Sequence, residues 1–296
     1  MRRLRLLLLV FFLVVFAVFM FSSIRDYVTS DYEAPVITSD DESMSLSVND
    51  SEDLLLAGMS AQDNLDGDVT NSIVVVSKSK FIAKATRNVS YAAFDKNNNV
   101  GTFVKKLVYT DYYSPRFVLT EPLRFVAGNS SYDYVRHLRA TDCLDGNLSS
   151  QIKVTVGSKE ISNESVSEQP VHFLVTNSAG DSSSIELVAT YEDYETYSKA
   201  SPALTDYIIY LKIGEKPNYR AYLDGIWTAG NTRKFSDLKF DPDEDVSIDD
   251  SKVDYRNPGV YKVTYKLTRG TPAADGGTYR TDFGTTTLYV VVEDKA

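Results

Sequence analysis

The hydrophobic pattern of the chain changes sharply near residue 25. Residues 6–24 carry no charge and are mostly Leu, Val and Phe, and Arg2, Arg3 and Arg5 precede them. At about 1.5 Å per residue in a helix, this run just spans the hydrocarbon core of a bilayer. Because basic residues stay on the cytoplasmic side, we expect a cytoplasmic N-terminus, a single membrane pass and an extracellular remainder.

A cleaved signal peptide is the alternative interpretation of the same run. Cleavage requires small residues at positions −3 and −1 before the mature start. The candidate ends Phe21-Ser22-Ser23 and Met20-Phe21-Ser22 have a small residue at −1 but a bulky one at −3. The pattern therefore favours an uncleaved signal anchor in the cell membrane, and cleavage would make the protein secreted.

After the anchor, short apolar runs alternate with polar turns. Apolar side chains occupy every second position in three of these runs: Val89, Tyr91 and Ala93; Val171, Phe173 and Val175; and Tyr261, Val263, Tyr265 and Leu267. A period of two is typical of strands with one buried face. Strands every 8–12 residues or so, with turns between them, predict all-β sandwiches of about seven strands each.

The chain also repeats an acidic turn. Residues 63–70, Asp-Asn-Leu-Asp-Gly-Asp-Val-Thr, return as residues 142–149, Asp-Cys-Leu-Asp-Gly-Asn-Leu-Ser, 79 positions later (142 − 63). Pro35, Pro115 and Pro202 each stand before a short β-run, a few residues after an Asp-Tyr pair. Proline suits the first position of an edge strand, where no ladder N–H is needed. The repeat and these prolines predict three modules.

The predicted division of the chain runs in the following order: cytoplasmic tail 1–5, transmembrane signal anchor 6–24, juxtamembrane linker 25–33, module one 34–111, module two 112–192, linker 193–201 and module three 202–296. The junctions are short and contain little glycine. We therefore expect the modules to sit end to end with restricted bending.

Module three is the most diverged of the three. Its flanking strands indicate that 241–245 is the degenerate counterpart of the acidic turn, rather than Leu223-Asp224-Gly225. Pro258 and Gly259 predict a type II turn before the strand that starts at Val260.

Composition narrows the function classes. The formal charge is −10, and without the three N-terminal arginines the rest carries −13 (28 basic against 41 acidic residues). An acidic body repels phosphate backbones, so we expect no nucleic-acid partner. Cys143 is the only cysteine, so no intrachain disulfide can form and packing must hold the modules. A disulfide-free extracellular β-protein is ordinary for bacteria of the Gram-positive type.

Three motifs resemble those of the bacterial surface-protein Ig-like domain family, a module also found in pesticidal crystal proteins and close to hyalin-type repeats. They are the acidic turn from Ala61, the Asn-Ser-Ala-Gly turn from Asn177 and Asn-Pro-Gly-Val-Tyr-Lys-Val-Thr-Tyr from Asn257. In that family one module carries all of them, whereas here they are distributed over three. The resemblance implies tandem Ig-like sandwiches at a cell surface, with no shared active site to carry over.

The acidic turns are the candidate metal site. Several carboxylates on a tight turn suit calcium, and the candidate ligands are Asp63, Asp66, Asp68, Asp142 and Asp145. Their spacing is not that of an EF-hand, and the second copy has Asn147 where Asp68 stood. The alternative is a turn whose carboxylates accept hydrogen bonds from backbone N–H groups. No other cofactor is expected.

Candidate binding and catalytic residues are sparse. Trp227, Tyr219 and Tyr222 form either a carbohydrate-stacking patch or a buried aromatic cluster. His137 and His172 lack a neighbouring motif for a catalytic triad or a zinc site, and His172 should point outward. Nearby carboxylates should raise the pKa of Cys143 and dull it as a nucleophile. We therefore predict no enzymatic activity.

These observations predict a membrane-anchored extracellular repeat protein with an interaction, adhesion or spacer role. Its partner is an unidentified surface protein or glycan, and the N-terminal helix contacts the membrane. The alternative is a glycan- or cell-wall-binding accessory module for an envelope enzyme or a polysaccharide system.

Overall fold

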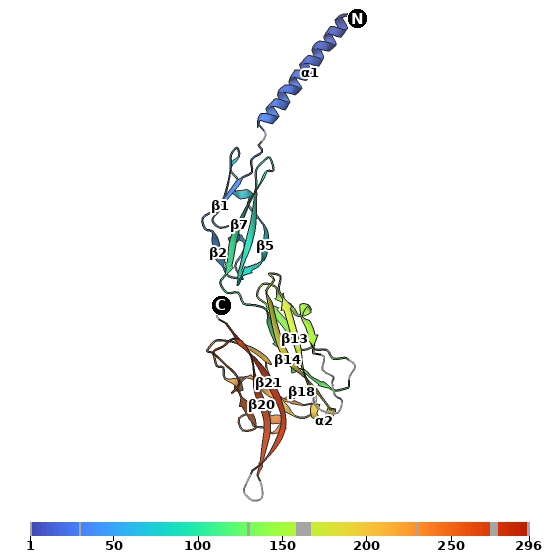
Figure 1. Ribbon diagram of the computed structural model, residues 1–296, viewed down its shortest axis with the longest axis vertical. Helices are drawn as coiled ribbons and strands as arrows, with labels where there is room; N and C mark the ends of the chain where they lie inside the picture. The colour runs from blue at the N-terminus through green and yellow to red at the C-terminus, as the bar shows by residue number, and fades with distance from the viewer. Residues whose placement is uncertain are drawn as a thin grey trace. The chain divides into compact units, whose positions relative to one another are not determined.

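The computed structural model describes residues 2–29, 31–128, 131–157, 167–228, 230–272 and 278–294. The chain divides into two compact units, Met1–Thr110 and Asp111–Ala296 (Figure 1). The first contains the N-terminal helix and module one, and the second contains modules two and three.

The N-terminal helix α1 spans Arg2–Thr29. Within it, Leu4–Arg25 is a run of 22 residues with a mean hydropathy of 2.9 and none of it buried, so it is long and apolar enough to cross a membrane. A membrane anchor and a signal sequence both have this length and composition. The cytoplasmic position of the N-terminus stays a prediction.

Module one is a sandwich of a three-stranded and a four-stranded sheet. The first sheet has the order β1-β3-β4, and the second has the order β2-β7-β6-β5 with β2 parallel to β7. The strands are β1 (Val36–Ser39), β2 (Ser43–Leu46), β3 (Met59–Asp63), β4 (Gly67–Asp68), β5 (Val74–Ala83), β6 (Thr86–Phe94) and β7 (Val100–Tyr109). Two short 3-10 turns, η1 (Glu52–Leu56) and η2 (Thr70–Ser72), connect them.

The core of module one follows the predicted alternation. Val89, Tyr91 and Ala93 of β6 are at most 1% exposed and pack with Ile37 and Leu107. The Tyr91 hydroxyl donates to the Leu55 carbonyl at 2.8 Å, which satisfies the one polar group that this ring buries. The two-residue period therefore identified the buried face of this strand correctly.

Modules two and three repeat the same three-plus-four arrangement. Module two has the sheets β11-β10-β8 and β12-β13-β14-β9, and module three has β15-β17-β18 and β16-β21-β20-β19. The strands of module two are β8 (Arg116–Leu119), β9 (Arg124–Val126), β10 (Leu138–Asp142), β11 (Gly146–Asn147), β12 (Lys153–Val156), β13 (Ser167–Thr176) and β14 (Ser182–Glu192). Those of module three are β15 (Ser201–Leu204), β16 (Ile208–Lys212), β17 (Leu223–Thr228), β18 (Asn231–Arg233), β19 (Val246–Asp249), β20 (Gly259–Pro272) and β21 (Thr278–Glu293).

Four short helical elements complete the second unit: η3 (Ser149–Gln151), α2 (Tyr194–Tyr197), η4 (Tyr219–Tyr222) and η5 (Ser236–Leu238). Seven strands in two sheets per module, after one apolar helix, confirm the prediction of tandem Ig-like β-sandwiches in an all-β chain.

Within β13, Val171, Phe173 and Val175 are at most 1% exposed, as their alternation predicted.

Modules two and three pack side by side, so the expected end-to-end arrangement is wrong for this pair (Figure 1). Their buried side chains form one continuous cluster, in which Phe117 and Leu187 of module two lie with Leu211 and Val290 of module three. A short junction limits the bending of two domains, but it does not prevent the second from folding back along the first.

Tyrosine hydroxyls of module three cover open strand edges of module two. The Phe117 N–H of β8 donates to the Tyr210 hydroxyl at 2.7 Å, and the Val188 N–H of β14 donates to the Tyr289 hydroxyl at 2.8 Å. Burial raises the pKa of Tyr210 and of Tyr289 to about 12, so both hydroxyls stay neutral acceptors at neutral pH. An edge strand otherwise exposes unpaired N–H groups, and these tyrosines satisfy two of them.

Two local predictions for module three are wrong. In modules one and two the acidic turn joins the middle strand of the three-stranded sheet to its short edge strand. The equivalent connection in module three runs from β17 to β18 and not through 241–245. Gly259 begins β20 without a left-handed φ, so Pro258 and Gly259 do not form a type II turn. Leu223-Asp224-Gly225 opens β17, as its rejection as a turn implied.

Candidate metal centre

The first aspartate of each acidic turn organises the turn through one carboxylate oxygen. Asp63 Oδ1 accepts the N–H groups of Leu65 at 3.0 Å and Asp66 at 2.8 Å. In the second copy, Asp142 Oδ1 accepts those of Leu144 at 2.9 Å and Asp145 at 3.0 Å. Oδ1 of both aspartates therefore serves as an acceptor for backbone N–H groups of the turn, which is the alternative to a calcium ligand.

The later acidic residues of the turns point to other partners. Asp66 pairs with Lys96 Nζ at 2.7 Å and accepts its backbone N–H at 2.7 Å, and this side-chain contact lowers the pKa of Asp66. Asp68 Oδ1 accepts the Thr70 N–H at 2.9 Å, and the hydrogen bond to Thr70 lowers the pKa of Asp68. Asp145 accepts from Ser178 in the same way as Asp66 does from Lys96. These three carboxylates are engaged as turn acceptors.

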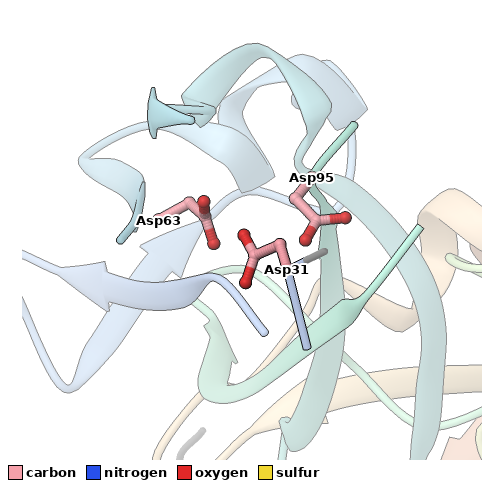
Figure 2. Close-up of side chains that lie close together, drawn as sticks. All are labelled: Asp31, Asp63 and Asp95. Carbon is pink, nitrogen blue, oxygen red and sulfur yellow. The ribbon is translucent and has the colours of Figure 1, made fainter. Parts of the chain in front are cut away.

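The structure brings Asp63 together with two aspartates that the sequence did not single out. Figure 2 shows Asp31, Asp63 and Asp95 with their carboxylates facing a common point. Each offers one oxygen, and the three oxygens lie within 4.8 Å of one another. The three residues are only 7%, 8% and 7% exposed. Of the five predicted calcium ligands, only Asp63 belongs to this group, among the residues that the structure describes.

Local hydrogen bonds hold Asp31 and Asp95 in place. Asn99 Nδ2 donates to the Asp31 carbonyl at 3.0 Å and to Asp95 Oδ2 at 2.6 Å. Asp95 Oδ1 accepts the Asn99 N–H at 2.7 Å, and Asp31 Oδ1 accepts the Glu33 N–H at 3.0 Å. The segment that carries Asp31 can lie against β7 because residue 101 is glycine, where a Cβ would stand 1.9 Å from the Pro35 carbonyl oxygen.

Two oxygens at the centre of this group lack partners. Asp31 Oδ2 and Asp63 Oδ2 are both shut off from solvent and accept no hydrogen bond within the described part of the chain. No basic side chain there forms an ion pair with any of the three aspartates; Lys96 is paired with Asp66. Burying a carboxylate oxygen without a partner is costly, and these two oxygens have neither a positive group nor a donor within the described residues.

Module two supplies donors at the same corner. Asn177 stands where module one has Asp95, and its Nδ2 donates to Asp142 Oδ2 at 3.2 Å and to the Tyr112 hydroxyl at 2.9 Å. The Tyr112 hydroxyl in turn donates to Asp181 Oδ2 at 2.6 Å, and burial together with Asp181 raises the pKa of Tyr112. The oxygen equivalent to the unpartnered Asp63 Oδ2 is thus satisfied by an amide.

The two modules present the Asp-Tyr pair before the first strand in opposite ways. In module one Asp31 is buried and Tyr32 is 74% exposed, whereas in module two Tyr112 is 5% exposed and Asp111 faces outward. The identical dipeptide therefore gave no signal of a difference. The difference that the sequence does contain lies at the two ends of the turn after β6 and β13. Module one has Asp95 and Asn99 there, and module two has Asn177 and Asp181.

The three residues of the predicted aromatic patch are largely buried. Trp227 and Tyr219 are each 6% exposed, and Tyr222 is half-buried against the cluster that contains Tyr219. The Trp227 ring meets Tyr197 edge-on at 5.0 Å and carries the Arg124 guanidinium at 4.8 Å. Trp227 thus contacts Tyr197 and Arg124, apart from the cluster that contains Tyr219 and Tyr222, and the three side chains form no shared exposed stacking surface.

A cavity of about 280 Å³ lies in the second unit, beside Trp227. Its walls combine aromatic and charged side chains from the loops of module two and from the junction with module three. They include Tyr132, Tyr197, Arg124, Arg136, His137 and Asp133. Such a mixture of ring faces and hydrogen-bonding groups is suited to a small polar ligand.

The remaining reactive side chains have ordinary partners. Burial, helped by Asp142, raises the pKa of Cys143, whose thiol donates to the Tyr113 carbonyl at 3.2 Å. His137 Nδ1 lies 3.4 Å from Glu121, and His172 Nε2 lies 3.0 Å from Glu186 with its side chain 60% exposed. His172 points outward as predicted.

Comparisons with known proteins give no family for this chain. No protein-family model and no curated protein matches it. Solved structures that align with it include a protocadherin GammaB4 extracellular domain (10% identity, TM-score 0.20, 89% of this chain and 50% of that one) and a protocadherin gammaB7 EC3-6 cis-dimer (11%, 0.21, 88% and 74%). A third is CBM51-2 in complex with GlcNAc and INT domains from Clostridium perfringens ZmpB (12%, 0.22, 87% and 44%). The chain thus spans half of the first match and less than half of the third. At these TM-scores we draw no functional conclusion from the likeness.

Proposed function

We propose that this chain is a non-enzymatic protein of the cell surface, anchored by α1, whose Ig-like modules serve as an interaction, adhesion or spacer element outside the membrane. The observation that carries the proposal is the direct succession of a basic tail, an apolar helix and acidic β-sandwiches. Arg2, Arg3 and Arg5 precede the span Leu4–Arg25 or stand at its start, and the charge of −13 lies after them.

The packing of the second unit supports a mechanical role. A single hydrophobic cluster runs through modules two and three, so load on one is carried by the other without a flexible joint. The side chains of His137 and His172 each lie beside a glutamate, and the Cys143 thiol donates to a backbone carbonyl.

Membrane fractionation with surface proteolysis tests this proposal. Intact cells that produce the full chain should retain it in the membrane fraction, and external protease should remove the modules while leaving a small fragment that contains residues 1–25. Mass spectrometry of the mature N-terminus decides between anchor and signal peptide. A soluble protein, or modules protected from external protease, contradicts the proposal.

A second candidate function is glycan binding in support of an envelope enzyme or polysaccharide system. The cavity beside Trp227 favours it, because Tyr132 and Tyr197 offer ring faces and Arg136 and His137 offer hydrogen-bond donors. Substituting Trp227 would disturb the core. Arg136 is exposed, so Arg136→Ala together with His137→Ala is the appropriate variant.

Retention on peptidoglycan or polysaccharide resins tests this second candidate. The glycan function predicts retention of the wild-type chain and at least a roughly tenfold loss in the double variant, as expected when two good hydrogen bonds at about 1 kcal/mol each are removed. A chain that no glycan retains, or a double variant retained as well as the wild type, rules out glycan binding at this cavity.

A further inference from the structure

The corner of module one has too many acceptors for its donors. Three buried carboxylates converge, two of their oxygens, Asp31 Oδ2 and Asp63 Oδ2, have no partner in the described chain, and no basic side chain there forms an ion pair with them. Hydrogen bonds from Glu33, Leu65 and Asp66 N–H groups fix the opposite oxygens, so the unpartnered oxygens cannot turn away without breaking these bonds.

The dimensions of the group fit a calcium ion. Calcium–oxygen bonds are about 2.3–2.6 Å, so oxygens on opposite sides of one ion are about 4.6–5.2 Å apart. The three aspartate oxygens lie within 4.8 Å of one another, and one ion can therefore contact all of them. Magnesium keeps several of its waters, whereas two of these oxygens are closed to solvent, which favours calcium.

At the matching corner of module two, neutral side chains donate hydrogen bonds to the carboxylates. There the amide of Asn177 and the hydroxyl of Tyr112 donate to Asp142 and Asp181. The backbone hydrogen bonds of the acidic turn recur in both modules, and so does the N–H that the facing turn donates to it. What differs at the oxygen facing the centre is that module two supplies donors and module one does not, within the described residues.

We propose that Asp31, Asp63 and Asp95 bind a calcium ion, and that this ion fastens the segment before β1 to the two turns at the end of module one. Asp63 comes from the acidic turn after β3, Asp95 from the turn after β6, and Asp31 from the leading segment. Asn97 and Asn99 link the leading segment to the turn after β6, and Lys96 links that turn to Asp66 of the acidic turn. The ion adds one point at which all three segments meet. The proposal goes beyond the proposed surface function and does not depend on it.

Calcium titration of the full chain in detergent tests the proposal. The wild-type chain should bind one calcium ion per chain, and saturating calcium should raise the melting temperature of module one by about 5 °C or more. Magnesium at the same concentration should give a smaller rise. Limited proteolysis should cut the segment at residues 26–33 faster when a chelator is present.

The decisive variant exchanges two residues without changing the charge. Asp95→Asn with Asn99→Asp copies the arrangement of Asn177 and Asp181 into module one. It should lose the calcium response, with affinity at least about tenfold weaker because a charged ligand is removed from the centre. Asp31→Asn, which changes a residue ahead of the first strand, is a second variant with the same expected loss.

Asp66→Asn is the matched control, because Asp66 belongs to the same turn but pairs with Lys96. It should keep the calcium response. Absence of binding to the wild-type chain overturns the proposal. So does an unchanged response in the exchanged variant, or an equal loss in Asp66→Asn, which would reveal general screening of an acidic surface. If mild acid raises the melting temperature of module one and calcium does not, the proposal is also overturned. A proton shared by the three aspartates would then neutralise them in place of calcium.

Discussion

One side chain decides whether a buried acidic corner is satisfied by the protein itself. In module two the amide of Asn177 donates to Asp142, and its Oδ1 accepts the Asp181 N–H at 2.9 Å. In module one Asp95 offers acceptors only, and the facing oxygen of Asp63 has no partner among the described residues. Asparagine and aspartate have nearly the same shape, so the difference is chemical rather than steric.

Asn177→Asp should destabilise the second unit by about 3 kcal/mol or more at pH 7, measured by urea denaturation with a chelator present. The change removes two donated hydrogen bonds and places a buried carboxylate beside Asp142. Burial and the neighbouring charge raise the folded-state pKa of the new carboxyl above its unfolded value. The folded state then binds more protons, so the loss should shrink as pH falls through that raised pKa.

Asn147→Asp is the matched control for this prediction. It also copies the residue of module one into module two, but at an exposed position where the side chain caps the Ser149 N–H at 3.0 Å. A carboxylate makes the same bond in module one, so the change should stay within about 0.5 kcal/mol. Equal losses in the two variants would contradict the role given to Asn177.

At the scale of single strands, polar groups at sheet edges set how modules two and three meet. The two edge N–H groups at Phe117 and Val188 donate to tyrosine hydroxyls on β16 and β21. Arg116 adds a bidentate pair with Glu293 and lies between the rings of Tyr113 and Tyr210. These contacts fix the position of one sheet along the other.

Tyr289→Phe should cost about 1–2 kcal/mol in the unfolding free energy of the second unit, because the half-buried Val188 N–H loses its acceptor. Chemical denaturation followed by intrinsic fluorescence measures it. Tyr261→Phe removes a hydroxyl that donates to the Asn257 carbonyl at an exposed position and should change stability by less than about 0.5 kcal/mol. If Tyr289→Phe leaves the unfolding free energy unchanged, the hydrogen bond to the Val188 N–H does not stabilise the contact between the modules.

The sequence predicted the strands better than it predicted what joins them. Alternation at Val89, Tyr91 and Ala93 reports burial directly, since a strand exposes its two faces in turn. Two of the three residues of the candidate metal centre were missed. Asp31 and Asp95 lie more than thirty positions from Asp63 on either side, and no local period connects them. The side-by-side packing depends on shape complementarity across modules, which hydropathy does not encode.

At the scale of the whole chain, one unit is held by packing and by a buried ion pair at the junction of modules two and three. Arg124 donates to Glu192 from Nε at 3.0 Å and from Nη2 at 2.7 Å, and their side chains are only 11% and 10% exposed. Arg124 also reaches Ser201, which opens β15 of module three, and lies over Trp227, the residue that pairs with Ser201 on β17. The guanidinium therefore pairs with Glu192 within module two and links that module to module three through a hydrogen bond and a ring contact.

Arg124→Met should destabilise the second unit by about 3–5 kcal/mol, because it leaves Glu192 buried without a partner. Lys266→Met breaks a pair with Asp282 whose side chains are 43% and 63% exposed, and should cost less than about 1 kcal/mol. Urea denaturation midpoints of the two variants, measured at low and at high salt, distinguish the buried pair from the exposed pair, because salt screens only the exposed pair strongly. A loss at Arg124 as small as that at Lys266 would contradict a junction locked by this residue.

The most direct test of this account is a calorimetric scan of the full chain in detergent, with calcium and with chelator. Two transitions are expected, because Met1–Thr110 and Asp111–Ala296 have separate cores. Calcium should raise the transition of module one by about 5 °C or more and leave the transition of modules two and three in place. A single transition for all three modules, or two transitions that calcium shifts equally or not at all, would contradict it.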